Sequence, residues 1–79
     1  MDTPGGTPMS EIGLRAARAI REMVDKNDTT QTRELERLKI ASTQLFQYDH
    51  LIADPGAAVL QRMANSGYDV LYILTGERK

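Results

Sequence analysis

The side chains best suited to specific hydrogen bonding stand close together in the middle of the chain, between residues 42 and 47. Ser42 and Thr43 carry hydroxyl groups, and Gln44 and Gln47 carry amides that donate and accept at once. A glutamine amide can pair with the N6 and N7 atoms of adenine in the major groove of DNA. Spacing alone, however, favours an ordinary solvated helix face, so this run is only a candidate recognition surface.

Other chemistry-bearing residues are too few for catalysis or metal binding. His50 follows Asp49, and such a pair could do acid–base work. No nucleophile or second base lies near it in the sequence, so a histidine at the surface or packed in a loop is favoured. The absence of cysteine and the single histidine exclude disulfides, thiolate sites and multi-histidine zinc sites. We therefore expect no enzyme activity, cofactor or metal ion.

Aromatic residues offer a second candidate surface. Tyr48, Tyr68 and Tyr72 could stack on bases, but they lie in two regions without a dense basic surround, and packing is favoured. Phe46 differs, because it falls one helical turn from Ser42. Three roles stay open for Phe46: contact with a thymine methyl group, contact with a partner protein, or partial burial.

Length and composition limit the architecture. Seventy-nine residues make one small domain, whose core is marginal without very good helix packing or a partner subunit. Ten Lys and Arg against eleven Asp and Glu give a net charge of −1, a mild argument against nucleic acid. No signal peptide is recognisable, and no apolar run reaches the roughly 18 residues of a membrane helix. We expect a cytoplasmic protein without membrane contact.

Helical periodicity and turn residues predict five helices and no sheet. Residues 1–9 hold two prolines and two glycines and are predicted to form a disordered arm. A strand near the C-terminus has some propensity support, but no other segment alternates, so a strand there has no partner. The predicted helices span about Ser10 to Lys26, Thr30 to Leu38, Ser42 to His50, Ala57 to Ser66, and Asp69 to Thr75.

Particular residues mark the helix ends and the inward faces. Thr30 and Asp69 are the expected N-caps, and Gly67 and Gly76 are expected to end helices in the left-handed conformation. The residues expected to face inward are Ile12, Ala16, Ala19, Ile20, Met23, Leu35, Leu38, Ile40, Leu45, Tyr48, Val59, Leu60, Met63, Val70, Ile73 and Leu74. Outward apolar residues near the C-terminus exceed what a small monomer should expose, which predicts a homodimer interface. That interface comprises Tyr68, Leu71 and Tyr72.

An ordered set of residues joins these features between residues 30 and 55. The set is Thr30-Gln31, Ile40, Ser42-Thr43-Gln44, Tyr48-Asp49 and Pro55. Its order and gap-free spacing resemble the core of the XRE family, the lambda-repressor-like DNA-binding domains of phage and bacterial regulators. The tail GYDVLYILTGER resembles the family's final helix. The resemblance implies an all-α, five-helix, lambda-repressor-like bundle with a helix-turn-helix, formed by residues 10–79.

The resemblance also implies a function and its residues. It implies a sequence-specific transcriptional regulator, expected to be a repressor, that binds double-stranded DNA as a homodimer in the cytoplasm, associated with the bacterial nucleoid. A regulatory protein partner is a further expectation. By position, base contacts fall to Ser42, Thr43, Gln44 and Gln47, on a recognition helix of about residues 42–50. Phosphate contacts fall to Gln31, with Arg33, Arg37 and Lys39 as candidate partners.

Charge distribution keeps a second function open. No Lys or Arg occurs from Ala41 to Gln61, so the predicted recognition helix has little positive charge around it. If the chain binds DNA, we expect weak binding per monomer and a need for dimerisation. The alternative is a protein-interaction adaptor or anti-repressor, built on a helix-turn-helix fold that has lost DNA binding.

Overall fold

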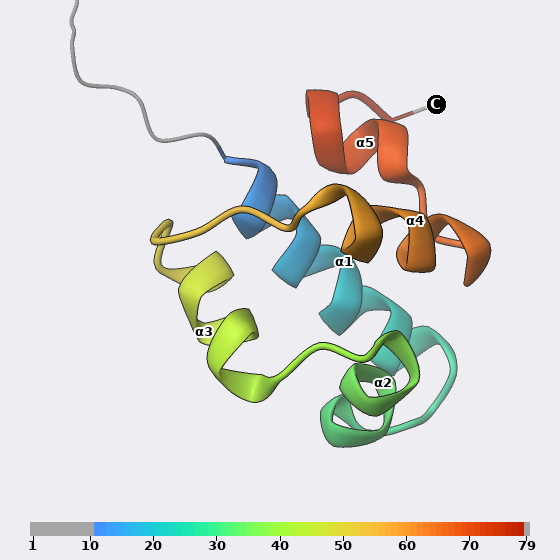
Figure 1. Cartoon of the computed structure of the whole chain (residues 1–79). Coiled ribbons are helices and arrows are strands. Elements are labelled where there is room, and N and C mark those ends of the chain that lie inside the picture. Colours follow the sequence, from blue (N-terminus) through green and yellow to red (C-terminus); the bar gives the residue numbers. More distant parts are fainter. Residues whose placement is uncertain (1–10, 79) are drawn as a thin grey trace, which may run out of the picture.

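The chain folds into five α-helices in a computed structural model that describes residues 11 to 78 (Figure 1). No strand occurs in this part of the chain, so the predicted all-α, five-helix bundle is confirmed. The predicted arm (residues 1–9), the predicted helix start at Ser10 and the residue Lys79 lie outside the described residues. The helices are α1 (Ile12–Lys26), α2 (Gln31–Leu38), α3 (Ser42–Asp49), α4 (Ala57–Asn65) and α5 (Val70–Thr75).

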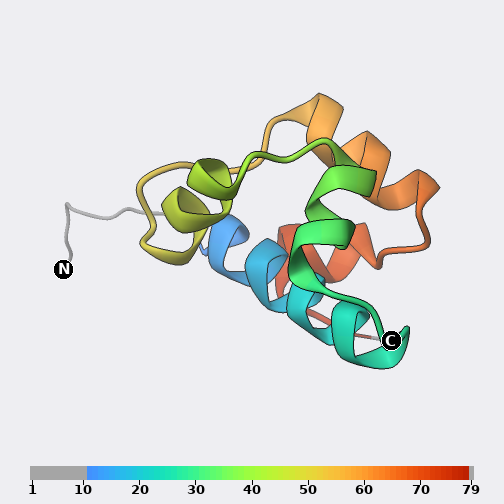
Figure 2. The ribbon, with the colours of Figure 1, turned by 90° about the horizontal axis from the view of Figure 1, so that it is seen from below.

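The first helix is the centre of the bundle. It contacts α2, α3 and α5, while α4 contacts α2 and α5. Figures 1 and 2, two views at right angles, show α3 and α5 on different sides of α1. Ala16, Ala17 and Ile20 of α1 are fully buried. Small side chains at two of these three positions let the neighbouring helices approach α1 closely.

Capping groups explain where the shorter helices begin and end. The Thr30 hydroxyl accepts a hydrogen bond from a backbone N–H of the first turn of α2 at 3.2 Å. The Asp69 carboxylate does the same for α5 at 3.0 Å. Gly67 and Gly76 have backbone φ angles of 92° and 81°, in the left-handed region that glycine tolerates. All four predicted end residues are confirmed.

Every residue predicted to face inward is buried or partly buried, except Leu74. Leu74, predicted to be inside, is 43% exposed. The partly buried members are Ile12, Ala19, Met23, Leu60 and Val70. The residues that were predicted to face inward and are buried are Ala16, Ile20, Leu35, Leu38, Ile40, Leu45, Tyr48, Val59, Met63 and Ile73.

The final helix turns a different face to the core than its sequence suggests. Tyr68 and Tyr72, expected at the surface in a dimer interface, are each only 7% exposed and belong to the core. Leu71 is 50% exposed, as expected, and Leu74 lies beside it at i+3. The predicted exposure at a dimer interface was therefore wrong for both tyrosines, whose burial agrees with the packing role favoured over base stacking. The exposed apolar surface of α5 consists of Leu71 and Leu74.

Two arginines of α1 explain which face of α5 is turned toward the core. Arg15 donates from Nε to the carbonyl of Ile73 at 2.9 Å and from Nη2 to the carbonyl of Leu74 at 3.1 Å. A cation at this end of a helix also favours the helix dipole. Arg18 donates to the Tyr72 hydroxyl at 3.5 Å, so the polar tip of this buried ring has a partner. These contacts fix the α5 carbonyls and Tyr72 against α1.

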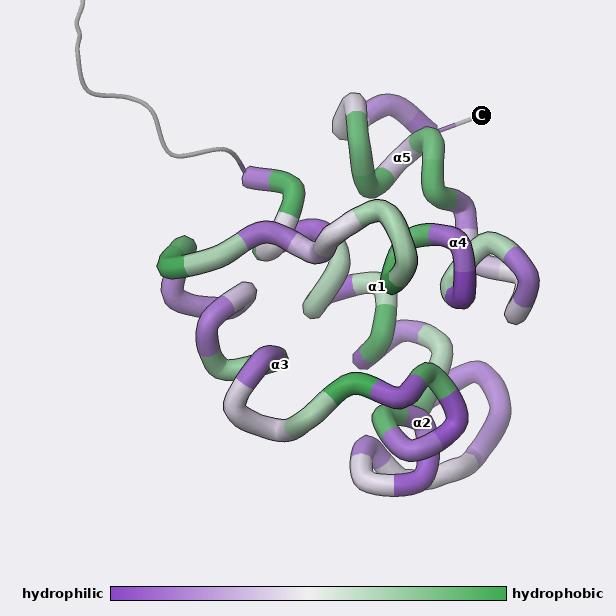
Figure 3. Tube along the Cα trace, in the orientation of Figure 1, coloured by the Kyte–Doolittle hydropathy of each residue, from purple (hydrophilic) through white to green (hydrophobic). Residues whose placement is uncertain are grey.

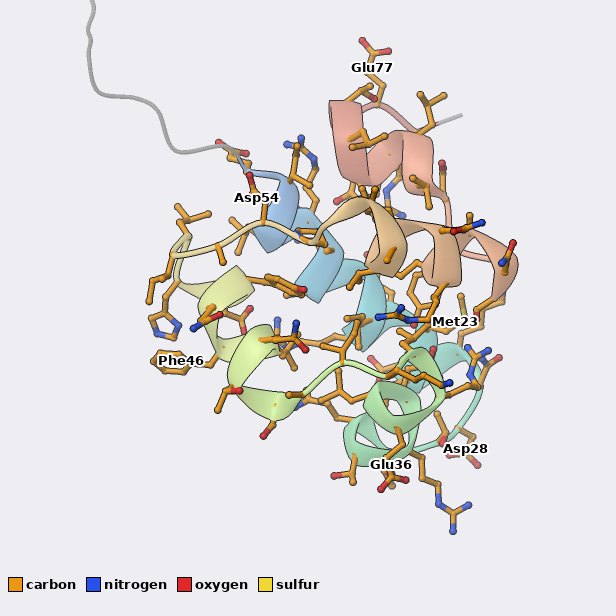
Figure 4. All side chains as sticks on the ribbon, viewed as in Figure 1. Met23, Asp28, Glu36, Phe46, Asp54 and Glu77 are labelled. Carbon is orange, nitrogen blue, oxygen red and sulfur yellow. The ribbon has the colours of Figure 1, made fainter. Side chains whose placement is uncertain are left out.

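A close backbone approach holds α1 to α3 and to the loop after it. A Cβ added at Gly13 would lie 2.7 Å from the carbonyl oxygen of Ala53 and 3.1 Å from the Cα of Tyr48. The Asp54 carboxylate accepts a hydrogen bond from the Gly13 N–H at 3.3 Å. Figure 4 shows Asp54 beside the start of α1. A side chain larger than hydrogen therefore does not fit at residue 13.

Two non-glycine residues in the left-handed region lie on either side of α3. Lys39, which ends α2, has φ 59° and ψ 43°, and Leu51, which follows α3, has φ 59°. An L-residue with a Cβ is strained there, by about 1–2 kcal/mol.

Relieving this strain should stabilise the protein. Lys39→Gly is expected to raise the free energy of unfolding by about 1 kcal/mol, because glycine adopts this conformation without the Cβ penalty. Lys39→Ala removes the same charge but keeps a Cβ, so it should give no such gain. Urea unfolding followed by far-UV circular dichroism measures both variants. Equal stability of the two variants would contradict conformational strain as the cause.

Candidate nucleic-acid interface

The turn between α2 and α3 is closed by backbone hydrogen bonds at the end of α2. The Lys39 N–H donates to the Glu36 carbonyl at 3.1 Å, and the Ile40 N–H donates to the Leu35 carbonyl at 2.9 Å. Ile40 is 4% exposed and anchors the turn in the core. Leu45 of α3 is also buried, at 3%. The inner face of α3 is thus fixed, and its opposite face points away from the bundle.

That opposite face is an exposed row of residues without charged arginine, lysine or carboxylate side chains. We call it the α3 row; its members are Ser42, Thr43, Phe46, Gln47 and His50. Their spacing of one and four residues places them along one side of the helix. The side chains of Ser42, Thr43 and Gln47 make no hydrogen bond with another residue between 11 and 78. Three of the four predicted base-reading residues therefore present free hydrogen-bonding groups together.

The fourth predicted base-reading residue is used differently. Gln44 is half-buried, and its Oε1 accepts a hydrogen bond from the Ala41 N–H at 2.8 Å. This is one half of a capping box, since alanine has no side-chain acceptor for the other half. Gln44 therefore caps the start of α3 with its Oε1, and its amide NH₂ group is not used in that hydrogen bond.

An aromatic pair occupies the C-terminal half of the α3 row. The rings of Phe46 and His50 stack with centroids 4.0 Å apart and planes inclined by 24°. His50 Nδ1 lies 2.9 Å from the Phe46 carbonyl oxygen, at hydrogen-bond distance. Phe46 is 55% exposed, and Figure 4 shows it pointing away from the bundle. His50 therefore has a structural partner, in agreement with the surface role favoured by the sequence.

The predicted phosphate contacts divide into free and engaged side chains. Gln31, Arg33 and Lys39 are exposed, and their side chains have no hydrogen bond or ion pair with another residue in the described range. Arg37 is engaged: its Nη2 lies 2.6 Å from Oε2 of Glu34, and its Nε lies 3.2 Å from Oε1. Among the four predicted phosphate residues, the free cations are thus Arg33, in the first turn of α2, and Lys39, in the turn before α3.

Most other arginines serve the fold. Arg62 donates to the carbonyl of Leu38, at the end of α2, at 2.7 Å. Arg78 pairs with Glu22 at 2.9 Å. Arg15 and Arg18 hold α5.

An ion pair fixes the C-terminal end of α3. Arg21 of α1 donates from both terminal nitrogens to the Asp49 carboxylate, with Nη1 at 2.8 Å from Oδ1. The hydrogen bonds from Arg21 lower the pKa of Asp49 below its ordinary value. Asp49 is therefore a positioning group between α1 and α3 rather than an acid–base partner for His50.

A buried carboxylate links α2 to the segment before α5, which the sequence did not reveal. Glu34 is 2% exposed, and the Tyr68 hydroxyl donates to its Oε2. Burial raises the pKa of Glu34, but the hydrogen bonds from Arg37 and Tyr68 outweigh burial and bring it below its ordinary value. The only sequence signal was the i, i+3 spacing of Glu34 and Arg37.

A pocket of about 260 Å³ lies between α1 and α5, outside the α3 row. Met23 and Tyr72 contribute apolar surface to it, and Arg78 lies over the Tyr72 ring at 4.0 Å from the ring centroid. Glu22, Lys26 and Asp69 also line it, so charges of both signs are mixed. It does not form a continuous surface with the predicted base-reading residues.

The comparisons with known proteins leave the family open. No family model, curated protein or solved structure matches the chain. The resemblance to the XRE family therefore stays a prediction from the residues themselves. In a separate respect, none of the helices within residues 11–78 has the length and apolar character needed to cross a membrane.

Proposed function

We propose that the protein is a sequence-specific DNA-binding regulator of transcription, acting as a repressor in the bacterial cytoplasm. The α3 row would lie in the major groove, with α2 crossing the DNA backbone. The observation that carries this proposal is that Ser42, Thr43 and Gln47 are exposed together on the helix that follows the Lys39 turn, with side chains free of hydrogen bonds to other residues of the described range 11–78. Hydroxyl and amide groups of this kind can read base edges.

Electrostatics supports only a modest phosphate contribution. Arg33 in the first turn of α2 and Lys39 in the turn before α3 are the free cations among the predicted phosphate residues, and Gln31 at the start of α2 adds a neutral contact. Two cations per subunit give about four per dimer, which predicts a slope of log affinity against log salt of about −4. A small slope of this size goes with modest affinity for the monomer, so a dimer on two half-sites is part of the proposal.

The dimer contact proposed from the structure is smaller than the one expected from the sequence. Leu71 and Leu74 share one face of α5 and are both about half exposed. Their pairing with the same residues of a second subunit would bury them around a two-fold axis. Such symmetry predicts a palindromic site whose half-sites are about one helical turn apart.

Selection of bound sequences from a random duplex pool tests the proposal. We expect a palindromic site to be enriched, and its affinity to fall by about tenfold or more in Gln47→Ala, which removes one base contact per subunit. Gln61→Ala is the matched control, because Gln61 is an exposed glutamine on α4, away from the α3 row. The absence of any enriched sequence, or equal effects of the two variants, would contradict the proposal.

A protein-interaction adaptor is the second candidate function. Phe46 and Ile52 are exposed by 55% and 61%, and no Lys or Arg lies between Ala41 and Gln61. Figure 3 shows the hydrophobic colour at the outer edge of the loop after α3. Apolar surface without cations suits a protein partner better than phosphates. Under this function, the pool selection would enrich nothing.

A further inference from the structure

The α3 row contains an exposed aromatic ring, Phe46, which hydrogen bonding to base edges would not use. Phe46 exposes 55% of its surface, yet its ring stacks on His50 with centroids 4.0 Å apart. His50 is itself held to the Phe46 carbonyl through Nδ1 at 2.9 Å. The pair therefore presents a pre-positioned apolar ring to whatever the row contacts, with little side-chain entropy left to lose.

The position of the ring relates it to the polar members of the row. Phe46 is four residues after Ser42 and one before Gln47, so it lies among the groups proposed to face base edges. In the major groove, the thymine C5-methyl is the apolar group that base pairs present, alongside hydrogen-bond donors and acceptors. A phenyl ring at this position matches that methyl and no polar base edge.

We propose that Phe46 is a specificity-determining residue that packs against a thymine methyl in each half-site. This inference rests on the proposed DNA binding and adds one base preference to it. His50 acts as a positioning residue, since it touches the Phe46 ring and sets its orientation. Burying one methyl group against a ring corresponds to about a fourfold gain in affinity per half-site.

The test removes the methyl from the DNA. In the site enriched from the random pool, each thymine is replaced in turn by deoxyuridine, which differs only by that methyl. Fluorescence anisotropy measures the affinity of the full chain for each duplex. We expect one thymine per half-site whose replacement weakens binding about fourfold, or about fifteenfold when both half-sites are changed.

Variants then assign the effect to the ring. Phe46→Ala should bind the thymine and deoxyuridine duplexes equally, and His50→Ala should reduce the difference between them. Gln47→Ala should bind both more weakly and keep the full difference. Unfolding of Phe46→Ala by urea serves as the folding control, because an exposed ring contributes little to stability.

The outcomes separate this inference from the proposed function. A chain that binds the enriched DNA without any thymine–deoxyuridine difference, or whose Phe46→Ala variant keeps the difference, overturns methyl reading while DNA binding stands. If the chain enriches no DNA sequence, both the proposed DNA binding and the recognition of a thymine methyl are wrong. Contact of the Phe46 ring with a protein partner is then the remaining proposal.

Discussion

Replacing Gly13 by alanine is expected to lower the free energy of unfolding by about 1–3 kcal/mol, the usual range for overpacking. In most helices the same change stabilises, because alanine is the better helix former. Here the added Cβ would lie 2.7 Å from the Ala53 carbonyl oxygen and 3.2 Å from that of Tyr48. Both obstacles are backbone atoms, so α1 must move away from α3 and its following loop.

That movement would also break a hydrogen bond. The Asp54 carboxylate accepts from the Gly13 N–H at 3.3 Å, and a displaced loop loses this contact at the start of α1. Since α1 carries Arg21, the ion pair to Asp49 at the end of α3 would be strained as well. We expect Gly13→Ala to weaken binding at the α3 row in addition to stability.

Gly56 provides the matched control for Gly13. It precedes α4 with φ −77°, and a Cβ added to it meets nothing within 4 Å. Gly56→Ala should therefore change the free energy of unfolding by less than about 1 kcal/mol. Urea midpoints from circular dichroism compare the two variants. A Gly13→Ala variant as stable as Gly56→Ala would show that α1 and α3 are not in close backbone contact.

Removing the Tyr68 hydroxyl is the second change expected to have a large effect. Tyr68→Phe deletes the donor to buried Glu34, and a hydrogen bond to a charged group contributes about 1.5–3 kcal/mol. Glu34 then keeps Arg37 as its partner, so the fold should persist with reduced stability. Tyr48→Phe is the control, because Tyr48 is equally buried and its hydroxyl has no hydrogen-bond partner in residues 11–78. It should be nearly neutral or stabilising.

The pH dependence distinguishes the two tyrosine variants. The pKa of Glu34 is below its ordinary value, so its contribution is present at neutral pH and is lost as the pH falls through that lowered pKa. Tyr68→Phe removes one of the hydrogen bonds that keep the Glu34 pKa low. Acid unfolding should therefore begin at higher pH in Tyr68→Phe and remain unchanged in Tyr48→Phe.

At alkaline pH the sign is reversed. Burial and the hydrogen bond to Glu34 raise the pKa of Tyr68, so its contribution is complete below the ordinary tyrosine pKa of about 10 and is lost as the pH rises further. Tyr68→Phe should be less sensitive to pH above about 10 than the parent chain.

The acid experiment decides whether this hydrogen bond has the proposed role. A midpoint of acid unfolding that is the same in Tyr68→Phe and in the parent chain would contradict it.

The predictions from sequence succeeded where the signal is local. Thr30, Asp69, Gly67 and Gly76 mark helix ends through contacts with their own neighbours in the chain, so residue type alone locates them. The inward face of the long α1 also followed from periodicity, because fifteen residues define the phase of a helix well. The exposure of Ser42, Thr43 and Gln47 agrees with the positions that the family resemblance gave them, while Gln44 is half-buried.

The failures concern contacts between elements. The six residues of α5 are too few for periodicity to fix its phase, and Arg15 and Arg18 of α1 decide which side of it is buried. The pairing of Arg37 with Glu34, which Tyr68 joins from another part of the chain, was also not predicted. Such pairings depend on the assembled bundle, and sequence spacing alone does not specify them.

The exposure of the polar residues in the α3 row affects how readily substitutions there can change binding without lowering stability. The side chains of Ser42, Thr43 and Gln47 are exposed and make no hydrogen bond within residues 11–78, while Leu45 on the same helix is 3% exposed in the core. Exposed substitutions of this kind usually alter stability by less than about 0.5 kcal/mol. New ligand preferences can therefore arise by single replacements in the row, without passing through unfolded intermediates, and a library at these three positions can be screened on a constant scaffold.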